Sequence, residues 1–186
     1  MATAARELGY PENHEIIMLA QLEWTNADKA IKARLEEERW APKMAEYPVA
    51  TKVWRFLKDK GYNDAVSAGI LGNMMTEAGG QTLNLNVNAY NVQGFYGLCQ
   101  WNMGYSEVWW TGLDEQLNFL EDSIEYEFNT FGSNYRKNFN YESFKNMTNE
   151  QDAALAFAKA YERCGSSCYS IRQQNASKAL RYFTTF

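Results

Sequence analysis

Glu77 is the residue whose type and position best suit acid–base chemistry. Apolar residues recur at helical spacing from residue 64 to residue 77, which predicts a helix there. Glu77 shares a largely apolar face of this helix with Ile70 and Met74. Burial on that face and the negative end of the helix dipole are expected to raise the pKa of the Glu77 carboxyl. Such a protonated carboxyl suits the general acid of glycosidic cleavage. The competing interpretation is that Glu77 merely ends a helix in solvent.

The composition argues against several other kinds of protein. His14 is the one histidine, which disfavours Ser-His-Asp hydrolases, Cys-His peptidases and histidine-rich zinc sites. A cysteine peptidase or amidase built on Cys99 is the runner-up enzyme class, and it would need His14 to reach across from the N-terminal segment. No metal and no cofactor is expected. The net charge of −5, without a basic stripe, argues against nucleic-acid binding.

The elements that would position Glu77 are mostly helical. Residues 81–96 alternate between apolar and polar types, which suits a short polar-faced β-hairpin or an irregular loop, and helical spacing returns near Gly97. A capping box from Thr148 to Gln151 is expected to open a late helix. The sequence therefore predicts an α+β, mainly helical fold. Further helices are expected over four segments: 49–60, 114–131, 148–161 and 170–183.

The N-terminal quarter of the chain is expected to be separate from this fold. Residues 12–40 are predicted to form two helices, the second capped by Thr25 with Asp28. Two prolines shortly afterwards bracket a joint. The predicted organisation is an N-terminal helical extension over residues 1–47 and a catalytic domain over residues 48–186.

Cysteine usage and the N-terminus bear on where the protein works. Cys164 and Cys168 flank a short turn and could close a disulfide, but the odd count, with Cys99 left over, favours free thiols. No long apolar run follows Met1, so no signal peptide is expected, and no segment is apolar enough for membrane insertion.

Four ordered motifs resemble those of a known family. Glu77-Ala78-Gly79 followed by a Gly-x-x-Gly-Leu-x-Gln stretch is similar to goose-type lysozymes and lytic transglycosylases. The closer resemblance is to the phage tail lysozyme family, and it covers the chain from about Val49 to its end. Ala78 stands where that family commonly has serine. The matching segments are Gly72–Gly79, Tyr96–Trp101, Leu113–Leu120 and Tyr161–Arg163.

The resemblance implies a lysozyme-like fold whose small β-hairpin lines an active-site cleft. In such a fold Glu77 protonates the glycosidic oxygen, and the helix start at the Gly-Leu-x-Gln-Trp motif forms part of the cleft wall. Gln100 would hydrogen-bond the substrate, and aromatic rings would stack on sugars, although Trp101 could instead be a core residue. The expected substrate-binding residues are Tyr90, Asn91, Tyr96, Gln100 and Trp101.

The expected reaction is cleavage of the β-1,4 bond between N-acetylmuramic acid and N-acetylglucosamine in bacterial peptidoglycan. Hydrolytic glycosidases usually pair two carboxylates. Glu107 is the one acidic residue between Glu77 and Asp114, and it is not expected to reach across the cleft. Asn or Tyr groups could position water in an inverting hydrolase. Alternatively, attack by the substrate's 6-hydroxyl would give a lytic transglycosylase that releases anhydro-muropeptides.

The resemblance also bears on location and partners. The protein is expected in the phage virion, associated with the tail, or in the host cytoplasm before lysis. Residues 1–47 could dock onto a tail or baseplate protein, or their apolar faces could pack on the catalytic domain. An alternative of another class is a structural or glycan-binding virion component with a degenerate site.

Overall fold

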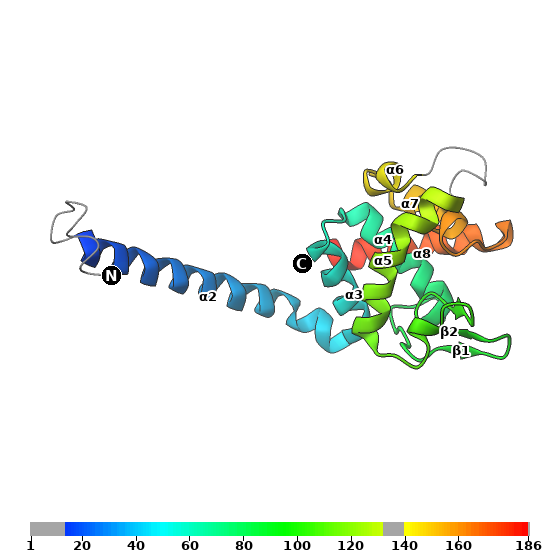
Figure 1. Ribbon diagram of the computed structural model, residues 1–186, viewed down its shortest axis with the longest axis horizontal. Helices are drawn as coiled ribbons and strands as arrows, with labels where there is room; N and C mark the ends of the chain where they lie inside the picture. The colour runs from blue at the N-terminus through cyan, green and yellow to red at the C-terminus, as the bar shows by residue number, and fades with distance from the viewer. Residues whose placement is uncertain (1–13, 132–139, 186) are drawn as a thin grey trace. The chain divides into compact units, whose positions relative to one another are not determined.

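The computed structural model describes residues 14–131 and 140–185, and it is mainly helical with one small sheet (Figure 1). The chain divides into two compact units, Met1–Pro42 and Lys43–Phe186. The helices are α2 (His14–Glu46), α3 (Pro48–Asp59), α4 (Asp64–Ala78), α5 (Leu113–Phe131), α6 (Tyr141–Lys145), α7 (Glu150–Ala160) and α8 (Tyr169–Thr184), with short 3-10 turns η1 (Ser106–Val108) and η2 (Ser166–Cys168).

The N-terminal segment forms one helix, α2, where two were predicted. The expected cap at Thr25 is wrong, because its hydroxyl donates to the carbonyl oxygen of Gln21 one turn earlier, at 2.8 Å, and the helix continues. In the part of the chain that the structure describes, no helix has both the length and the apolar character needed to span a membrane. The large apolar side chains that α2 exposes are Met18, Leu19, Leu22, Trp24, Ile31 and Leu35.

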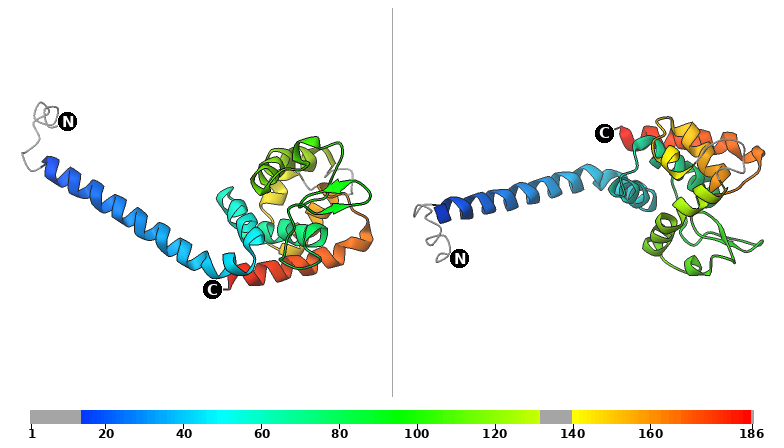
Figure 2. Two further views of the ribbon diagram at one scale, coloured as in Figure 1. Left: turned by 90° about the horizontal axis from the view of Figure 1, so that it is seen from below. Right: turned by 45° about the horizontal axis from the view of Figure 1, so that its top comes forward.

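Helix α4 is the centre of the second unit. It packs against α8, α7 and α3, and the four helices lie together in the second unit (Figures 1 and 2). Two glycines allow this close approach: a Cβ on Gly69 would lie 2.7 Å from Ala153 Cβ, and one on Gly72 would lie 2.5 Å from the backbone nitrogen of Ala176. The predicted helix that carries Glu77 is confirmed, and most of its side chains are buried.

Asparagines cap the helices around this core. The side chain of Asn63 accepts a hydrogen bond from the backbone of Val66 at 2.9 Å and starts α4. Helix α7 is capped by Asn149, which accepts from two backbone N–H groups of the first turn. The capping box predicted at Thr148 is therefore wrong by one residue, because the amide oxygen of Asn149 already takes those donors.

The sheet has three short antiparallel strands, β1 (Tyr90–Asn91), β2 (Phe95–Tyr96) and β3 (Trp101–Asn102), in that order. The expected hairpin is thus present, but the helix start expected near Gly97 is wrong, because a turn and β3 occupy that place. Gly97 and Gln100 have φ of 82° and 48°, in the left-handed region that does not continue a helix.

The expectation of free thiols at Cys164 and Cys168 is also wrong, because the two cysteines form a disulfide. The 3-10 turn between them brings their Cα atoms to 6.6 Å, within the range that a disulfide can bridge. Cys99 is free and buried.

Candidate active site

Glu77 lies in the last turn of α4 and is held from α8. Its carboxylate forms an ion pair with the Arg172 guanidinium, whose NH1 donates to the side-chain oxygen of Asn73 at 2.9 Å. Asn73 in turn donates to the backbone oxygens of Gly69 and Ala154, at 2.8 and 3.0 Å. This chain of bonds joins α4, α7 and α8. It therefore fixes both the position and the direction of the Glu77 carboxylate.

The surroundings of Glu77 differ from the apolar face that its sequence position suggested. The Arg172 side chain is 4% exposed and that of Glu77 is 22% exposed, so the pair is largely shielded from water. The carboxylate therefore lies against a cation and not against the apolar face that was expected. Sequence reasoning missed Arg172, because no local pattern links it to a residue on α4.

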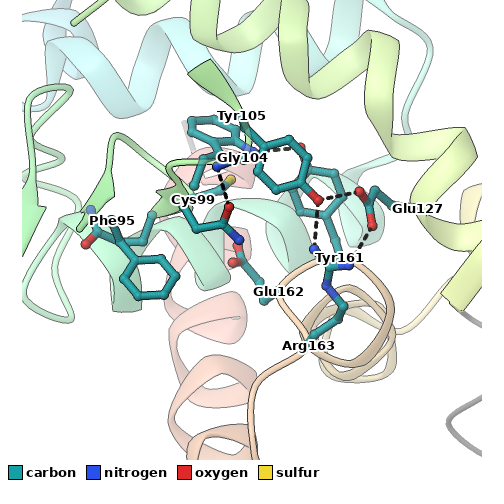
Figure 3. A pocket seen from close by; sticks show the side chains of 11 residues that line it. Phe95, Cys99, Gly104, Tyr105, Glu127, Tyr161, Glu162 and Arg163 are labelled. Carbon is teal, nitrogen blue, oxygen red and sulfur yellow. Dashed lines mark hydrogen bonds and ion pairs between the residues drawn. The ribbon is translucent and has the colours of Figure 1, made fainter. Parts of the chain in front are cut away.

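The second unit contains a cavity of about 560 Å3 (Figure 3). Its walls come from the β2–β3 region, α5 and the segment after α7. Glu77 is outside this lining, but its charge acts on Cys99 and Glu162, which both belong to the lining. The lining residues of most chemical interest are Cys99, Gln100, Trp101, Tyr105, Glu127, Glu162 and Arg163.

Gln100 lines the cavity and organises the hairpin. Its side-chain nitrogen donates to the backbone oxygens of Ala89 and Gly97, both at 3.0 Å, and its oxygen accepts from the side chain of Asn91 at 2.9 Å. Asn91 uses its own oxygen to accept from two backbone N–H groups of the β1–β2 turn. Two predicted substrate-binding residues, Gln100 and Asn91, are therefore brought together, and their present bonds shape the cavity wall.

The predicted aromatic residues fall into two environments. Tyr90 is 55% exposed and packs against Trp110, which is 74% exposed, with ring centroids 6.0 Å apart. Tyr96 is fully buried beneath them, and its hydroxyl donates to the side chain of Asn88 at 2.6 Å. Of the aromatic residues predicted to stack on sugars, Tyr90 is therefore the one whose ring lies at the surface.

Trp101 has the character of a core residue with one edge at the cavity. It is 4% exposed, and its indole nitrogen donates to the Tyr161 hydroxyl at 3.0 Å. The ring of Phe119 meets it edge-on at 5.7 Å. The indole is thus fixed on two sides, and its predicted contact with substrate involves the part that lines the cavity.

Two acidic side chains line the cavity, and neither was singled out for catalysis from the sequence. Glu127 is paired: it accepts from the Tyr105 hydroxyl at 2.8 Å and lies 3.5 Å from a nitrogen of Arg163. Glu162 has a different environment, because burial and the nearby Glu77 charge raise the pKa of its carboxyl well above the usual range. Glu107, the acid considered from the sequence, lies exposed in η1, outside the cavity lining.

The comparison with protein families agrees with this arrangement. The family model for phage tail lysozymes matches residues 48–183. The chain belongs to the phage tail lysozyme family. This match runs from the start of α3 into the last turn of α8. Membership in the phage tail lysozyme family implies peptidoglycan degradation and an association with the phage tail. No curated protein matches the chain in a sequence search.

The family resemblance could have pointed to Glu162, because Tyr161–Arg163 was one of the four motifs. The spacing of that motif says nothing of chemistry, however. Its meaning depends on the packing of α7 against α4, which is a tertiary feature of this phage tail lysozyme fold.

Proposed function

We propose that this protein cleaves the β-1,4 bond between N-acetylmuramic acid and N-acetylglucosamine in bacterial peptidoglycan, with Glu77 as the general acid. The observation that carries the proposal is the position of Glu77. Its carboxylate is fixed by Arg172 in the last turn of α4, and its charge acts on two groups that line the cavity, Cys99 and Glu162. A fixed carboxyl group beside a cavity suits proton transfer to a bound substrate.

In this mechanism the Glu77 carboxyl gives its proton to the glycosidic oxygen as the bond from that oxygen to the sugar C1 breaks. Positive charge develops on the sugar ring, and the carboxylate that remains stabilises it. Gln100, Asn91 and Trp101 would contact the glycan in the cavity. Tyr90, and Tyr96 beneath it, would form the aromatic wall beyond the hairpin.

Water is the proposed acceptor, which makes the protein a glycoside hydrolase of the muramidase type. The alternative acceptor is the 6-hydroxyl of the muramic acid residue, which would make it a lytic transglycosylase. Mass spectrometry of the muropeptides released from purified peptidoglycan separates the two reactions. Hydrolysis gives reducing-end muramic acid, and transglycosylation gives the anhydro sugar. Fragments that carry only cut peptide bonds would contradict both.

We further propose that residues 1–47 dock the enzyme onto a tail or baseplate protein through the exposed apolar side chains of α2. A variant with Leu22→Ser, Ile31→Ser and Leu35→Ser should be depleted from assembled virions, because these three side chains are more than half exposed and apolar. Immunoblots of purified particles measure the incorporation. The same variant should release muropeptides at the wild-type rate, and normal incorporation would contradict the proposed docking.

A further inference from the structure

Four aromatic rings gather where the hairpin meets the segment after η1, and two of them have no role in the mechanism described so far. These rings, called the aromatic platform below, belong to Tyr90, Tyr96, Trp109 and Trp110. The centroid of the Trp110 ring lies 5.2 Å from that of Tyr96, 6.0 Å from that of Tyr90 and 6.1 Å from that of Trp109. Trp110 is also the most exposed residue of the four.

The backbone at Trp110 has a conformation that a bulky residue rarely adopts. Its φ is 62°, in the left-handed region, where the Cβ of an L-residue crowds the following carbonyl oxygen. The turn is anchored on both sides, because Val108 is fully buried and Thr111 Oγ1 donates to the Val108 carbonyl oxygen at 2.8 Å. It therefore holds the Trp110 ring at the surface, where burial does little to offset the strain. Strained residues of this kind collect at ligand-binding sites.

The aromatic platform is continuous with the cavity wall through the sheet. Tyr90 is paired in register with Tyr96, and Tyr96 with Trp101, which lines the cavity. Residues directly opposite each other on neighbouring strands place their side chains on the same face of a sheet. The three rings therefore form one row, which leads from the cavity to Trp110 along the hairpin that projects from the helices of the second unit (Figure 1).

The surface around the aromatic platform is polar but uncharged. Residues 78–106, which include all three strands, contain no acidic residue, no lysine, no arginine and no histidine. Their exposed polar side chains include the amides of Asn86, Asn88 and Gln93. Amides bind hydroxyl and acetamido groups, and the faces of Trp and Tyr rings pack on the C–H faces of sugars. Nucleic acids and anionic membranes would instead require basic side chains.

We propose that Trp110, supported by Tyr90 and Trp109, is an outer sugar-binding subsite that takes an uncharged N-acetylglucosamine residue of the glycan strand. The inference rests on the proposed function and adds to it a binding position outside the cavity lining. N-acetylglucosamine is the better match of the two sugars, because muramic acid carries a lactyl group and a charged peptide. The row of rings holds the strand along the hairpin and so positions the bond to be cut.

Titration calorimetry with chitotetraose, a neutral oligomer of N-acetylglucosamine, tests the subsite directly. All proteins carry Glu77→Gln, so that the oligosaccharide stays intact. Adding Trp110→Ala should weaken binding roughly tenfold, as expected for the loss of one ring contact, and Trp110→Phe should keep most of the affinity. The control Tyr126→Ala removes an exposed ring from α5 and should leave the affinity unchanged. Added salt should also leave it unchanged, because the aromatic platform holds the sugar without charges.

Trp110→Gly separates binding from folding. Glycine adopts a φ of 62° without strain, so Trp110→Gly should unfold at a higher temperature than Trp110→Ala and yet bind chitotetraose as weakly. In proteins that retain Glu77, Trp110→Ala should raise the KM for muropeptide release about tenfold and leave kcat near the wild-type value.

The subsite is overturned if the Trp110→Ala protein binds chitotetraose as tightly as its parent, or if the parent does not bind it. An equal loss in Tyr126→Ala, or binding that weakens with salt, also overturns it. If the parent binds through Trp110 while the wild type releases no muropeptides, the subsite stands and the proposed cleavage fails. If Trp110→Ala cleaves with the wild-type KM while Glu77→Gln is inactive, the subsite is wrong and the function of Glu77 stands.

Discussion

At the scale of single residues, the orientation of the Glu77 carboxylate depends on a partner that is distant in the sequence. Arg172 gives one nitrogen to Glu77 and another to Asn73, so one side chain of α8 orients two polar groups of α4. The position of Glu77 at a helix end could be predicted from periodicity. Its ion pair could not, because it depends on the way α8 packs on α4.

Replacing Arg172 with leucine should therefore destabilise the protein and reduce its activity. The substitution leaves the Glu77 carboxylate and the Asn73 oxygen without their donor in a largely shielded place, which typically costs about 3 kcal/mol in the free energy of unfolding. Urea unfolding followed by circular dichroism measures this loss. Arg181→Leu, on the exposed side of the same helix, is the control and should change stability by less than about 0.5 kcal/mol. Equal stability of the two variants would contradict the role given to Arg172.

At the scale of elements, the close packing of α4 against α8 is what brings Glu77 and Arg172 together. Periodicity predicted α5 and α8 well, since each buries one side against the core, and it predicted the extent of α4, although that helix is buried on nearly all sides. It failed for β3, because two residues with left-handed backbone break the helical pattern after Gly97. It also failed for the disulfide, because a residue count does not show that η2 brings two cysteines together.

Gly72→Ala tests the α4–α8 contact directly. The added Cβ would lie 2.5 Å from the backbone nitrogen of Ala176, so one helix must move away from the other. Overpacking of this kind costs roughly 1–3 kcal/mol, and the movement should also lower muropeptide release, because it displaces Glu77 from Arg172. Thermal unfolding and an activity assay measure the two effects. In Gly165→Ala the new Cβ meets nothing within 4 Å, so that variant should behave as the wild type. A Gly72→Ala protein with wild-type stability would disprove the tight contact.

At the scale of the whole molecule, the raised pKa of Glu162 makes stability depend on pH. Its ordinary value is 4.5, and burial and Glu77 raise it in the folded state. The folded protein therefore binds this proton more tightly than the unfolded chain does. The stabilisation is fully present below pH 4.5, and it is lost as the pH rises toward the folded-state pKa.

The wild type should consequently lose stability relative to Glu162→Gln as the pH rises from 4.5. The difference in the free energy of unfolding can change by at most about 1.4 kcal/mol per pH unit for one proton. Denaturant unfolding of both proteins at a series of pH values measures it. A difference that stays constant with pH, or that changes in favour of the wild type, would show that Glu162 is ionised in the folded protein.

The central claim is that Glu77 protonates the glycosidic bond, and the most direct measurement is the rate at which Glu77→Gln releases muropeptides from purified peptidoglycan. Circular dichroism and thermal unfolding first establish that the variant is folded, since it also loses the ion pair with Arg172. The rate should then fall by roughly 10²- to 10⁴-fold relative to the wild type, as expected when a general acid is removed. A folded Glu77→Gln protein that releases muropeptides at the wild-type rate would contradict the claim.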